Sequence, residues 1–322
     1  MNDAFGRTID YLRVSITDRC NLRCQYCMPE AIPLISHQDI LRYEEILRLC
    51  AIMAGMGIRN IKVTGGEPLT RKDCVPFMRK LKAVPGIEHV TLTTNAVLLE
   101  PYVEELALMK LDGLNISLDS LNPEIYCRIT GRDEFHKVWR ALNRALETKL
   151  HVKINCVPIK GFNEPEILSF AQLAEDMQVD IRFIELMPIG ADGNFHRVPS
   201  EEIINLLNGE YPDLKPDLTQ HGFGPARYFK SDRLKGSIGL IDAISNHFCF
   251  SCNRMRLTSE GFLKLCLYHG DRLDLRGMLR GGASDAEIEA GIKRAVYNKP
   301  ERHFFCQEEI GNRIGKMSRI GG

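Results

Sequence analysis

The sequence predicts an α/β fold, a partial (β/α)6 TIM-like barrel with a smaller C-terminal lobe. Short apolar runs with strand character alternate with segments of helical periodicity between Tyr11 and Leu186. No two-residue hairpin turns separate these runs, which favours parallel strands joined by right-handed crossovers. After about Tyr211 the pattern changes to loops that contain Pro and Gly, so a second lobe is expected there.

Strands and helices are expected in strict alternation through the first region. The strands are expected at Tyr11–Ile16, Ile58–Val63, Val90–Thr93, Leu114–Leu118, Val152–Val157 and Ile181–Leu186. The helices are expected from Tyr43 to Gly55 or Gly57, in a segment that closes at Leu81, and at Glu104–Met109, Lys137–Leu146 and Glu166–Met177. In barrels of this class the working residues lie at the carboxyl ends of the strands.

The C-terminal part is expected to contain shorter elements. Its strands are expected at Ser237–Ile241, Arg254–Leu257 and Phe262–Leu267, and its helices at Leu273–Leu279 and Asp285–Val296. We place the domain boundary after residue 220, so that residues 1–220 form the barrel core and residues 221–322 form the C-terminal lobe.

The charge balance argues against a general attraction to polyanions. Lys plus Arg and Asp plus Glu both number 42, so we expect neither nucleic acid nor a membrane as a partner. No apolar run approaches the ~20 residues of a membrane span, and Met1 to Asp10 lacks the pattern of a secretory signal. A cytoplasmic, reducing location is expected. We interpret five of the eleven cysteines as ordinary small buried groups: Cys50, Cys74, Cys127, Cys156 and Cys306.

The other six cysteines form two groups of three. The first cysteine triad is Cys20, Cys24 and Cys27, directly after the first expected strand. Thiolates suit iron clusters, and three of them leave one iron of a 4Fe-4S cubane without a protein sulfur, where a reactive molecule can bind. A zinc knuckle is the alternative, although no fourth Cys or His lies nearby to complete a tetrahedron.

The second cysteine triad is Cys249, Cys252 and Cys266. His247 and His269 stand near enough in the sequence to supply a fourth ligand, so a zinc site is again the alternative. Arg254 and Arg256 come shortly after Cys252 and lie in the predicted strand Arg254–Leu257. Because side chains alternate along a strand, both arginines are expected on one face, toward whatever the cysteines hold.

A third stretch, Gly65-Gly66-Glu67-Pro68, follows the second expected strand. We interpret it as a ligand site in preference to a simple tight turn, which Gly-Gly and Pro also favour. The reason is that glycine lets a backbone approach a ligand closely, and exposed oxygen acceptors suit an ammonium group.

The spacing C-x3-C-x2-C resembles that of the radical S-adenosylmethionine (SAM) superfamily. The chain also contains T-G-G-E-P-L-x-R-x-D, C-x2-C-N-R-x-R-x-T, a further Cys fourteen residues on and a terminal Gly-Gly. Together these motifs resemble the GTP 3′,8-cyclase family over nearly the whole chain. The resemblance implies two 4Fe-4S clusters, with SAM on the open iron of the first cluster and the purine of GTP facing the open iron of the second.

The resemblance also implies roles for individual residues. The residues implied to contact SAM are Tyr26, Gly66, Ser117 and Met187. Those implied to hold GTP are Arg13, Lys62, Thr93, Lys153, Arg254, Met255 and Arg256; the match at Lys153 requires a one-residue gap in the preceding helix. Arg13 and the terminal Gly321 and Gly322 are implied to act in catalysis, with the tail entering a narrow pocket that a Cβ atom would block. One departure from the family is Ala96, where Gly is usual.

The reaction implied by this resemblance converts GTP to (8S)-3′,8-cyclo-7,8-dihydroguanosine 5′-triphosphate in molybdenum cofactor biosynthesis. In the family a 5′-deoxyadenosyl radical abstracts the ribose 3′ hydrogen, and the carbon radical attacks C8 of guanine. The implied partners are an electron donor and the cyclic pyranopterin monophosphate synthase that takes the product, with a homodimer as an option. A peptide-modifying radical SAM enzyme and an iron-sulfur electron carrier are the rival interpretations, and GTP binding distinguishes them.

Overall fold

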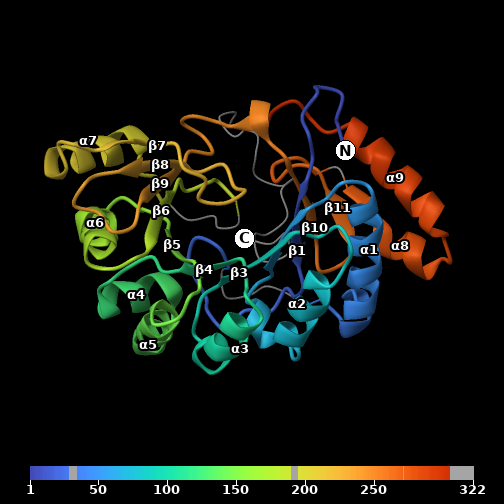
Figure 1. Cartoon of the computed structure of the whole chain (residues 1–322), viewed down its shortest axis with the longest axis horizontal. Coiled ribbons are helices and arrows are strands. Elements are labelled where there is room, and N and C mark those ends of the chain that lie inside the picture. The colour runs from blue at the N-terminus through green and yellow to red at the C-terminus, as the bar shows by residue number, and fades with distance from the viewer. Residues whose placement is uncertain (29–34, 190–194, 271, 305–322) are drawn as a thin grey trace. The chain divides into compact units, whose positions relative to one another are not determined.

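The computed structural model describes residues 1–28, 35–189, 195–270 and 272–304 (Figure 1). The chain forms two compact units, each built from segments distant in the sequence. Unit 1 comprises Met1–Asn21, Glu30–Leu92 and Cys249–Gly322, and unit 2 comprises Leu22–Pro29 and Thr93–Phe248. The predicted boundary after residue 220 divides the chain differently and stays a prediction.

The sheet of unit 1 has the strand order β12-β11-β10-β1-β2-β3. The strand β1 lies between β2 and β10 and is parallel to both, and β2 is parallel to β3. The strand β11 is antiparallel to β10 and β12. The bounds are β1 Tyr11–Ser15, β2 Asn60–Thr64, β3 His89–Thr94, β10 Arg254–Leu257, β11 Phe262–Lys264 and β12 Arg272–Asp274.

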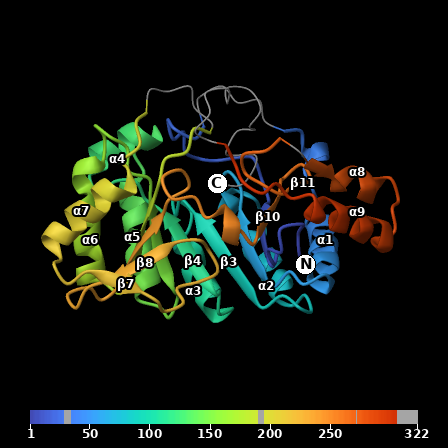
Figure 2. The same ribbon diagram turned by 90° about the horizontal axis from the view of Figure 1, so that it is seen from above.

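The helices of unit 1 are α1 (Tyr43–Gly55), α2 (Cys74–Lys82), α8 (Leu275–Arg280) and α9 (Asp285–Tyr297). Figure 2 shows α8 and α9 beside α1, and α9 contacts both of the other helices. Local sequence explains two helix starts, because Glu45 completes a capping box for α1 and Ser284 with Glu287 forms one for α9. These boxes satisfy amide groups that would otherwise lack partners in the first turn.

The sheet of unit 2 has the strand order β4-β5-β6-β9-β8-β7. The first four of these strands are parallel, whereas β8 is antiparallel to both β9 and β7. The strand bounds are β4 Gly113–Ser117, β5 Val152–Cys156, β6 Asp180–Ile184, β7 Lys215–Asp217, β8 Arg227–Lys230 and β9 Ile238–Ile241. The helix bounds are α3 Val103–Leu108, α4 Pro123–Thr130, α5 Phe135–Leu146, α6 Ile167–Asp176 and α7 Ser200–Glu210.

Each sheet has an apolar face in the core and an opposite polar face. In β1, Leu12 and Val14 are fully buried while Arg13 points to the other face. In β4, Leu114 and Ile116 are fully buried and alternate with Asn115. Figure 1 shows α4, α5 and α6 along one side of β4, β5 and β6. The polar faces therefore carry Arg13 and Asn115, on the side of the sheet opposite the apolar core.

Each strand and helix that was predicted up to β6 is confirmed, with ends that differ by at most two residues, but the expected alternation is broken between β4 and β5, where α4 precedes α5. Two helices, α4 and α7, were not predicted. The start of α4 carried a readable signal, since the Asn122 side chain accepts hydrogen bonds from the amides of Glu124 and Ile125, and Pro123 occupies the first helical position.

The prediction of loops directly after Tyr211 was wrong, because β7 and β8 form an antiparallel hairpin there. The strand β7 has three residues, includes Pro216 and is mostly exposed, so it shows no apolar alternation. Likewise β12 occupies residues that were expected to begin the helix at Leu273. Within the described residues, no helix is long and apolar enough to cross a membrane.

Candidate functional site

A row of basic residues crosses the polar face of unit 1. Arg13 on β1 lies directly opposite Lys62 on β2 and Arg256 on β10, and Arg256 lies opposite Lys264 on β11. Residues directly opposite one another on neighbouring strands have side chains on the same face. We call Lys62, Arg13, Arg256 and Lys264 the basic row. Three of its members were candidate GTP residues, and Lys264 was not predicted.

Like charges dominate the environment of the basic row. Burial lowers the pKa of Arg256 well below its usual range, and the positive charges of Arg13 and Arg254 lower it further. Burial also lowers the pKa of Lys264, which is 4% exposed, and the charge of Arg256 adds to the effect. Concentrated positive charge in a partly desolvated place is costly unless an anion binds there. The basic row therefore has the electrostatic character of an anion site.

Met255 lies on the other face of β10. It is 1% exposed and is paired in register with Leu12 of the core, so its side chain cannot share a ligand with the two arginines that flank it. Arg254 is half-buried, and its Nη2 lies 3.9 Å from the sulfur of Cys252. The structure thus confirms that Arg254 and Arg256 share a face.

The second cysteine triad lies in unit 1. Cys249 and Cys252 come just before β10, and Cys266 follows β11. A 3-10 turn at Cys249–Ser251 brings the Cys252 amide to 3.2 Å from the Cys249 carbonyl oxygen. Burial raises the pKa of the Cys249 thiol, and the charges of Cys266 and Cys252 raise it further. Burial alone would raise the pKa of Cys252 too, but the positive charges of Arg254 and Lys299 lower it to about 7.

The glycine stretch after β2 packs against the backbone that leads into the first cysteine triad. A Cβ atom on Gly66 would lie 2.4 Å from the Arg19 carbonyl oxygen, and one on Gly65 would lie 2.8 Å from that of Thr17. The Gly66 amide donates to the Thr17 carbonyl oxygen at 2.7 Å, and the Glu67 amide to that of Arg19 at 2.7 Å. Glycine is therefore required here, because any side chain would displace the segment that ends at Cys20.

The segment that carries Cys24 and Cys27 belongs to unit 2. The amides of Arg23 and Gln25 donate to the carbonyl oxygens of Thr130 and Ile129 at the end of α4, at 2.8 and 2.9 Å. The Cys27 amide donates to the Cys24 carbonyl oxygen at 3.0 Å and closes a turn. The helix α4, which was not predicted, therefore fixes the backbone of the segment that carries Cys24 and Cys27.

Tyr26, between these cysteines, donates a hydrogen bond of 2.6 Å to the carboxylate of Asp119, just after β4. Burial raises the pKa of Asp119 to about 6, although the hydrogen bonds from Tyr26 and the Val157 amide lower it. Asp119 was expected at the carboxyl end of the fourth strand, where working residues lie, but no motif gave it a role. It fixes the ring that the family resemblance assigns to SAM.

The remaining candidate SAM residues lie at strand ends of unit 2. Ser117 is the last residue of β4 and is half-buried. Met187 follows β6, is half-buried, and accepts a 2.7 Å hydrogen bond from the Ile189 amide. Thr93, a candidate GTP residue, is half-buried near the end of β3. Ala96 has φ +63°, a left-handed conformation that favours glycine, so the Gly that the resemblance implies at this position would fit its backbone.

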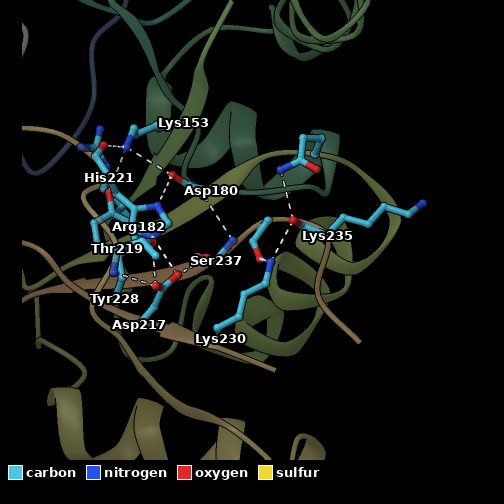
Figure 3. A network of polar contacts seen from close by, with 12 residues as sticks. Lys153, Asp180, Arg182, Asp217, Thr219, His221, Tyr228, Lys230, Lys235 and Ser237 are labelled. Atoms are coloured by element: carbon cyan, nitrogen blue, oxygen red, sulfur yellow. Dashed lines mark hydrogen bonds and ion pairs between the residues drawn. The ribbon is translucent and has the colours of Figure 1, made fainter. Parts of the chain in front are cut away.

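Lys153 on β5 is held in a network of polar side chains (Figure 3). Its Nζ lies 3.2 Å from an oxygen of Asp180, the residue directly opposite on β6, and donates to the His221 carbonyl oxygen. His221 places its two ring nitrogens 3.0 Å from Asp180 and 2.8 Å from Asp217, and its ring stacks on Tyr228. Burial lowers the pKa of Lys153, whereas the charge of Asp180 raises it.

Both triads have the donor chemistry of iron-sulfur sites. Their six thiols are free and half-buried, whereas Cys50, Cys74 and Cys156 are buried. Cys127 is half-buried, contrary to expectation, and Cys306 lies outside the described residues. Among the residues that the structure describes, no three His, Cys, Asp or Glu side chains form a group that could hold a single metal ion. The candidate catalytic residues Gly321 and Gly322 lie outside the described residues.

Two family profiles match the chain. The Radical SAM superfamily profile matches residues 14–174, and the Molybdenum Cofactor Synthesis C profile matches residues 179–305. The chain is 46% identical over 333 residues to the GTP 3′,8-cyclase of Heliobacterium modesticaldum and 47% identical over 328 residues to that of Moorella thermoacetica. Each alignment covers 100% of this chain and 100% of its relative.

Solved structures confirm the predicted fold class. The chain resembles Streptococcus suis SuiB bound to S-adenosylmethionine with a TM-score of 0.63 and 13% identity, over 89% of this chain and 68% of that chain. SuiB bound to the precursor peptide SuiA gives a TM-score of 0.62 and 14% identity, over 91% and 66% of the two chains. At this level of identity the likeness bears on the fold alone.

Proposed function

The chain belongs to the GTP 3′,8-cyclase family of radical SAM enzymes, and from that membership we propose how its residues divide the work. It is a radical SAM enzyme that carries two 4Fe-4S clusters and converts GTP to (8S)-3′,8-cyclo-7,8-dihydroguanosine 5′-triphosphate in molybdenum cofactor biosynthesis. When bound, the SAM-chelating cluster supplies the radical chemistry, and the protein orients the reactants and excludes water.

Our proposal assigns the first cluster to Cys20, Cys24 and Cys27. Gly66 would let the backbone of its stretch lie close to both the cysteine segment and SAM. Tyr26, oriented by Asp119, would border the adenine. Ser117 and Met187 would complete the SAM contacts from the ends of β4 and β6.

We assign the GTP triphosphate to the basic row, and this row is the observation that carries the assignment. Arg13, Lys62 and Arg256 stand side by side on three adjacent parallel strands. Guanidinium groups bind phosphate oxygens bidentately and ammonium groups bind them as point charges. Arg254 would add a contact beside the second cluster, held by Cys249, Cys252 and Cys266. Met255 would contribute through its backbone only, since its side chain is buried.

Several further parts of the proposal rest on family membership. By family membership Thr93 and Lys153 would also contact GTP, and Arg13 with Gly321 and Gly322 would act during cyclisation. The partners would be GTP, an electron donor and the cyclic pyranopterin monophosphate synthase, and the chain would work in the cytoplasm, with a homodimer as an option.

Anaerobic reconstitution tests the assignment. Iron and sulfide are counted per chain, and the protein is then incubated with GTP, SAM and dithionite. We expect iron for two 4Fe-4S clusters and a cyclised nucleotide. Cys24→Ser should abolish SAM cleavage, whereas Cys252→Ser should retain some SAM cleavage and lose cyclisation. Equal loss of SAM cleavage in both variants would contradict the division between the triads, and absence of a cyclised nucleotide in the unaltered protein would contradict the activity.

A further inference from the structure

A short segment after α9, Lys299–His303, contacts the second cysteine triad from outside the predicted motif. We call it the strap. Lys299 is 2% exposed, and its Nζ donates to the Arg254 carbonyl oxygen at 2.9 Å and to the Leu265 carbonyl oxygen. The first of these carbonyls is two residues after Cys252 and the second is one residue before Cys266. One ammonium group therefore holds two of the three cysteine segments together.

Arg7 fixes the strap and the third cysteine segment at the same time. Its Nη1 donates to the carbonyl oxygens of Cys249 at 2.8 Å and Glu301 at 2.7 Å, and its Nη2 donates to that of Pro300 at 2.7 Å. Asp3 accepts from Nε at 2.6 Å and orients the guanidinium. Because the fork of donors is rigid, one side chain sets the distance between the strap and Cys249.

The strap also reaches the sulfur and the flanking loop directly. The backbone of His303 forms a hydrogen bond with Cys249. The Arg302 carbonyl oxygen lies 3.0 Å from Nε2 of His269, three residues after Cys266. All three cysteine segments are therefore bound to the strap or to the residue that anchors it.

The charge of Lys299 is buried beside thiols. Burial lowers its pKa, and the negative charges of Cys252 and Cys266 raise it again. A buried ammonium group is costly unless an anion offsets the loss of hydration, and its two carbonyl partners are dipoles without net charge. A 4Fe-4S cluster on three thiolates is anionic and becomes more so on reduction, so this position suits a fixed cation.

We propose that Lys299 is a positioning residue for the second 4Fe-4S cluster: it aligns the segments of Cys252 and Cys266, and its charge favours the reduced form of the cluster. Arg7 anchors the strap that carries it. The inference rests on the two-cluster assignment and names residues that no motif of the sequence singled out. Hydrogen bonds and charges around a cluster are known to set its reduction potential.

The test replaces Lys299 with Met, which has a similar length and no charge, and with Arg, which keeps the charge. Lys293→Met on α9 is the matched control, because Lys293 is an exposed lysine of the same part of unit 1. The holoproteins are reconstituted anaerobically, iron and sulfide are counted, and reduction of each cluster is followed by electron paramagnetic resonance. Added SAM identifies the first cluster, since only that cluster chelates it.

In Lys299→Met we expect partial loss of the second cluster and a shift of its remaining reduction potential to a more negative value. Lys299→Arg should keep the cluster and show a smaller shift, and Lys293→Met should match the unaltered protein. Reductive SAM cleavage should be unchanged in all three, which excludes general misfolding. If Lys299→Met does not fold, Lys299→Gln answers the same question.

An unchanged loading and potential of the second cluster in Lys299→Met, or in Lys299→Gln, would overturn the inference. Failure of the two-cluster assignment gives a different result, since the unaltered protein itself would then contain iron for one cluster only.

Discussion

The polar faces of the two sheets both carry basic residues, but their charges are balanced in different ways. In unit 1 the residues opposite Arg13 are Lys62 and Arg256, so each cation of the basic row has another cation beside it. In unit 2 the residue opposite Lys153 is Asp180, and the two form an ion pair. The comparison shows that the residue directly opposite a lysine or arginine on the next strand differs between the two faces: another cation in the basic row, and a carboxylate at Lys153.

This difference predicts how much each residue that is proposed to hold GTP contributes to the free energy of binding. An anion bound at the basic row relieves repulsion between neighbouring cations, whereas an anion bound at Lys153 must compete with Asp180 and with the His221 carbonyl oxygen. Most of the binding free energy of the triphosphate should therefore come from unit 1.

The largest effect is expected for Arg256→Ala. Loss of a charge-assisted hydrogen bond should weaken GTP binding by roughly 1.5–3 kcal/mol, or about 10- to 150-fold. Equilibrium binding of GTP to the reconstituted enzyme measures this, with iron content as the check on cluster loading. Arg294→Ala, at an exposed position of α9, is the control and should bind GTP normally. Normal affinity in Arg256→Ala would remove the basic row from the GTP site.

A smaller effect is expected for Lys264→Met, at the end of the basic row. Lys264 should contribute as a point charge, so its loss should weaken GTP binding by roughly 1–2 kcal/mol and reduce the salt dependence of binding. Titrations of GTP at two ionic strengths measure both. Binding that matches the unaltered protein at both ionic strengths would exclude Lys264 and β11 from the GTP site.

Lys153→Met should weaken GTP binding by no more than about 1 kcal/mol, because Asp180 already balances the charge that is removed. The partner variant Asp180→Asn should leave GTP affinity unchanged or increase it, since it releases Lys153. The same binding assay compares both with Arg256→Ala. If Lys153→Met loses as much GTP affinity as Arg256→Ala, the proposed difference between the two polar faces is wrong.

The smallest effect is expected on the free energy of unfolding, from Asp217, a carboxylate of the polar network around Lys153. Although burial would raise the pKa of Asp217, hydrogen bonds from Thr219 and His221 hold it well below the ordinary 3.8. A carboxyl group whose pKa is lower in the folded state than in the unfolded state stabilises the folded state at pH values above the unfolded pKa, about 4. This contribution is lost progressively as the pH falls from about 4 toward the pKa of the folded state. Asp217→Asn should therefore lower the free energy of unfolding by roughly 0.5–1 kcal/mol at pH 7.

Denaturant unfolding at pH 7 and pH 3 measures this difference. The unaltered protein and Asp217→Asn should be closer in stability at pH 3 than at pH 7. A gap of equal size at both pH values would show that Asp217 acts through packing rather than through its charge.

The sequence was sufficient for the features that depend on residue type and local spacing. The two cysteine triads, the glycine stretch and the alternation of Arg254 with Arg256 all lie within short segments, where chemistry and backbone periodicity act directly. The order of strands and helices up to β6 was predictable for the same reason, because each element carries its own apolar pattern.

Only the tertiary structure decided which side chains meet across strands. Arg13 and Arg256 are neighbours because β1 pairs with β10, and Lys153 is balanced because β5 and β6 pair in a register that sets Asp180 opposite it. Arg7 and Lys299 reach the second cysteine triad from opposite ends of the sequence. Strand register and long-range packing are set by the free energy of the whole chain, so they cannot be predicted from a local sequence pattern. For the same reason, the sequence does not indicate which neighbour will balance a given charge.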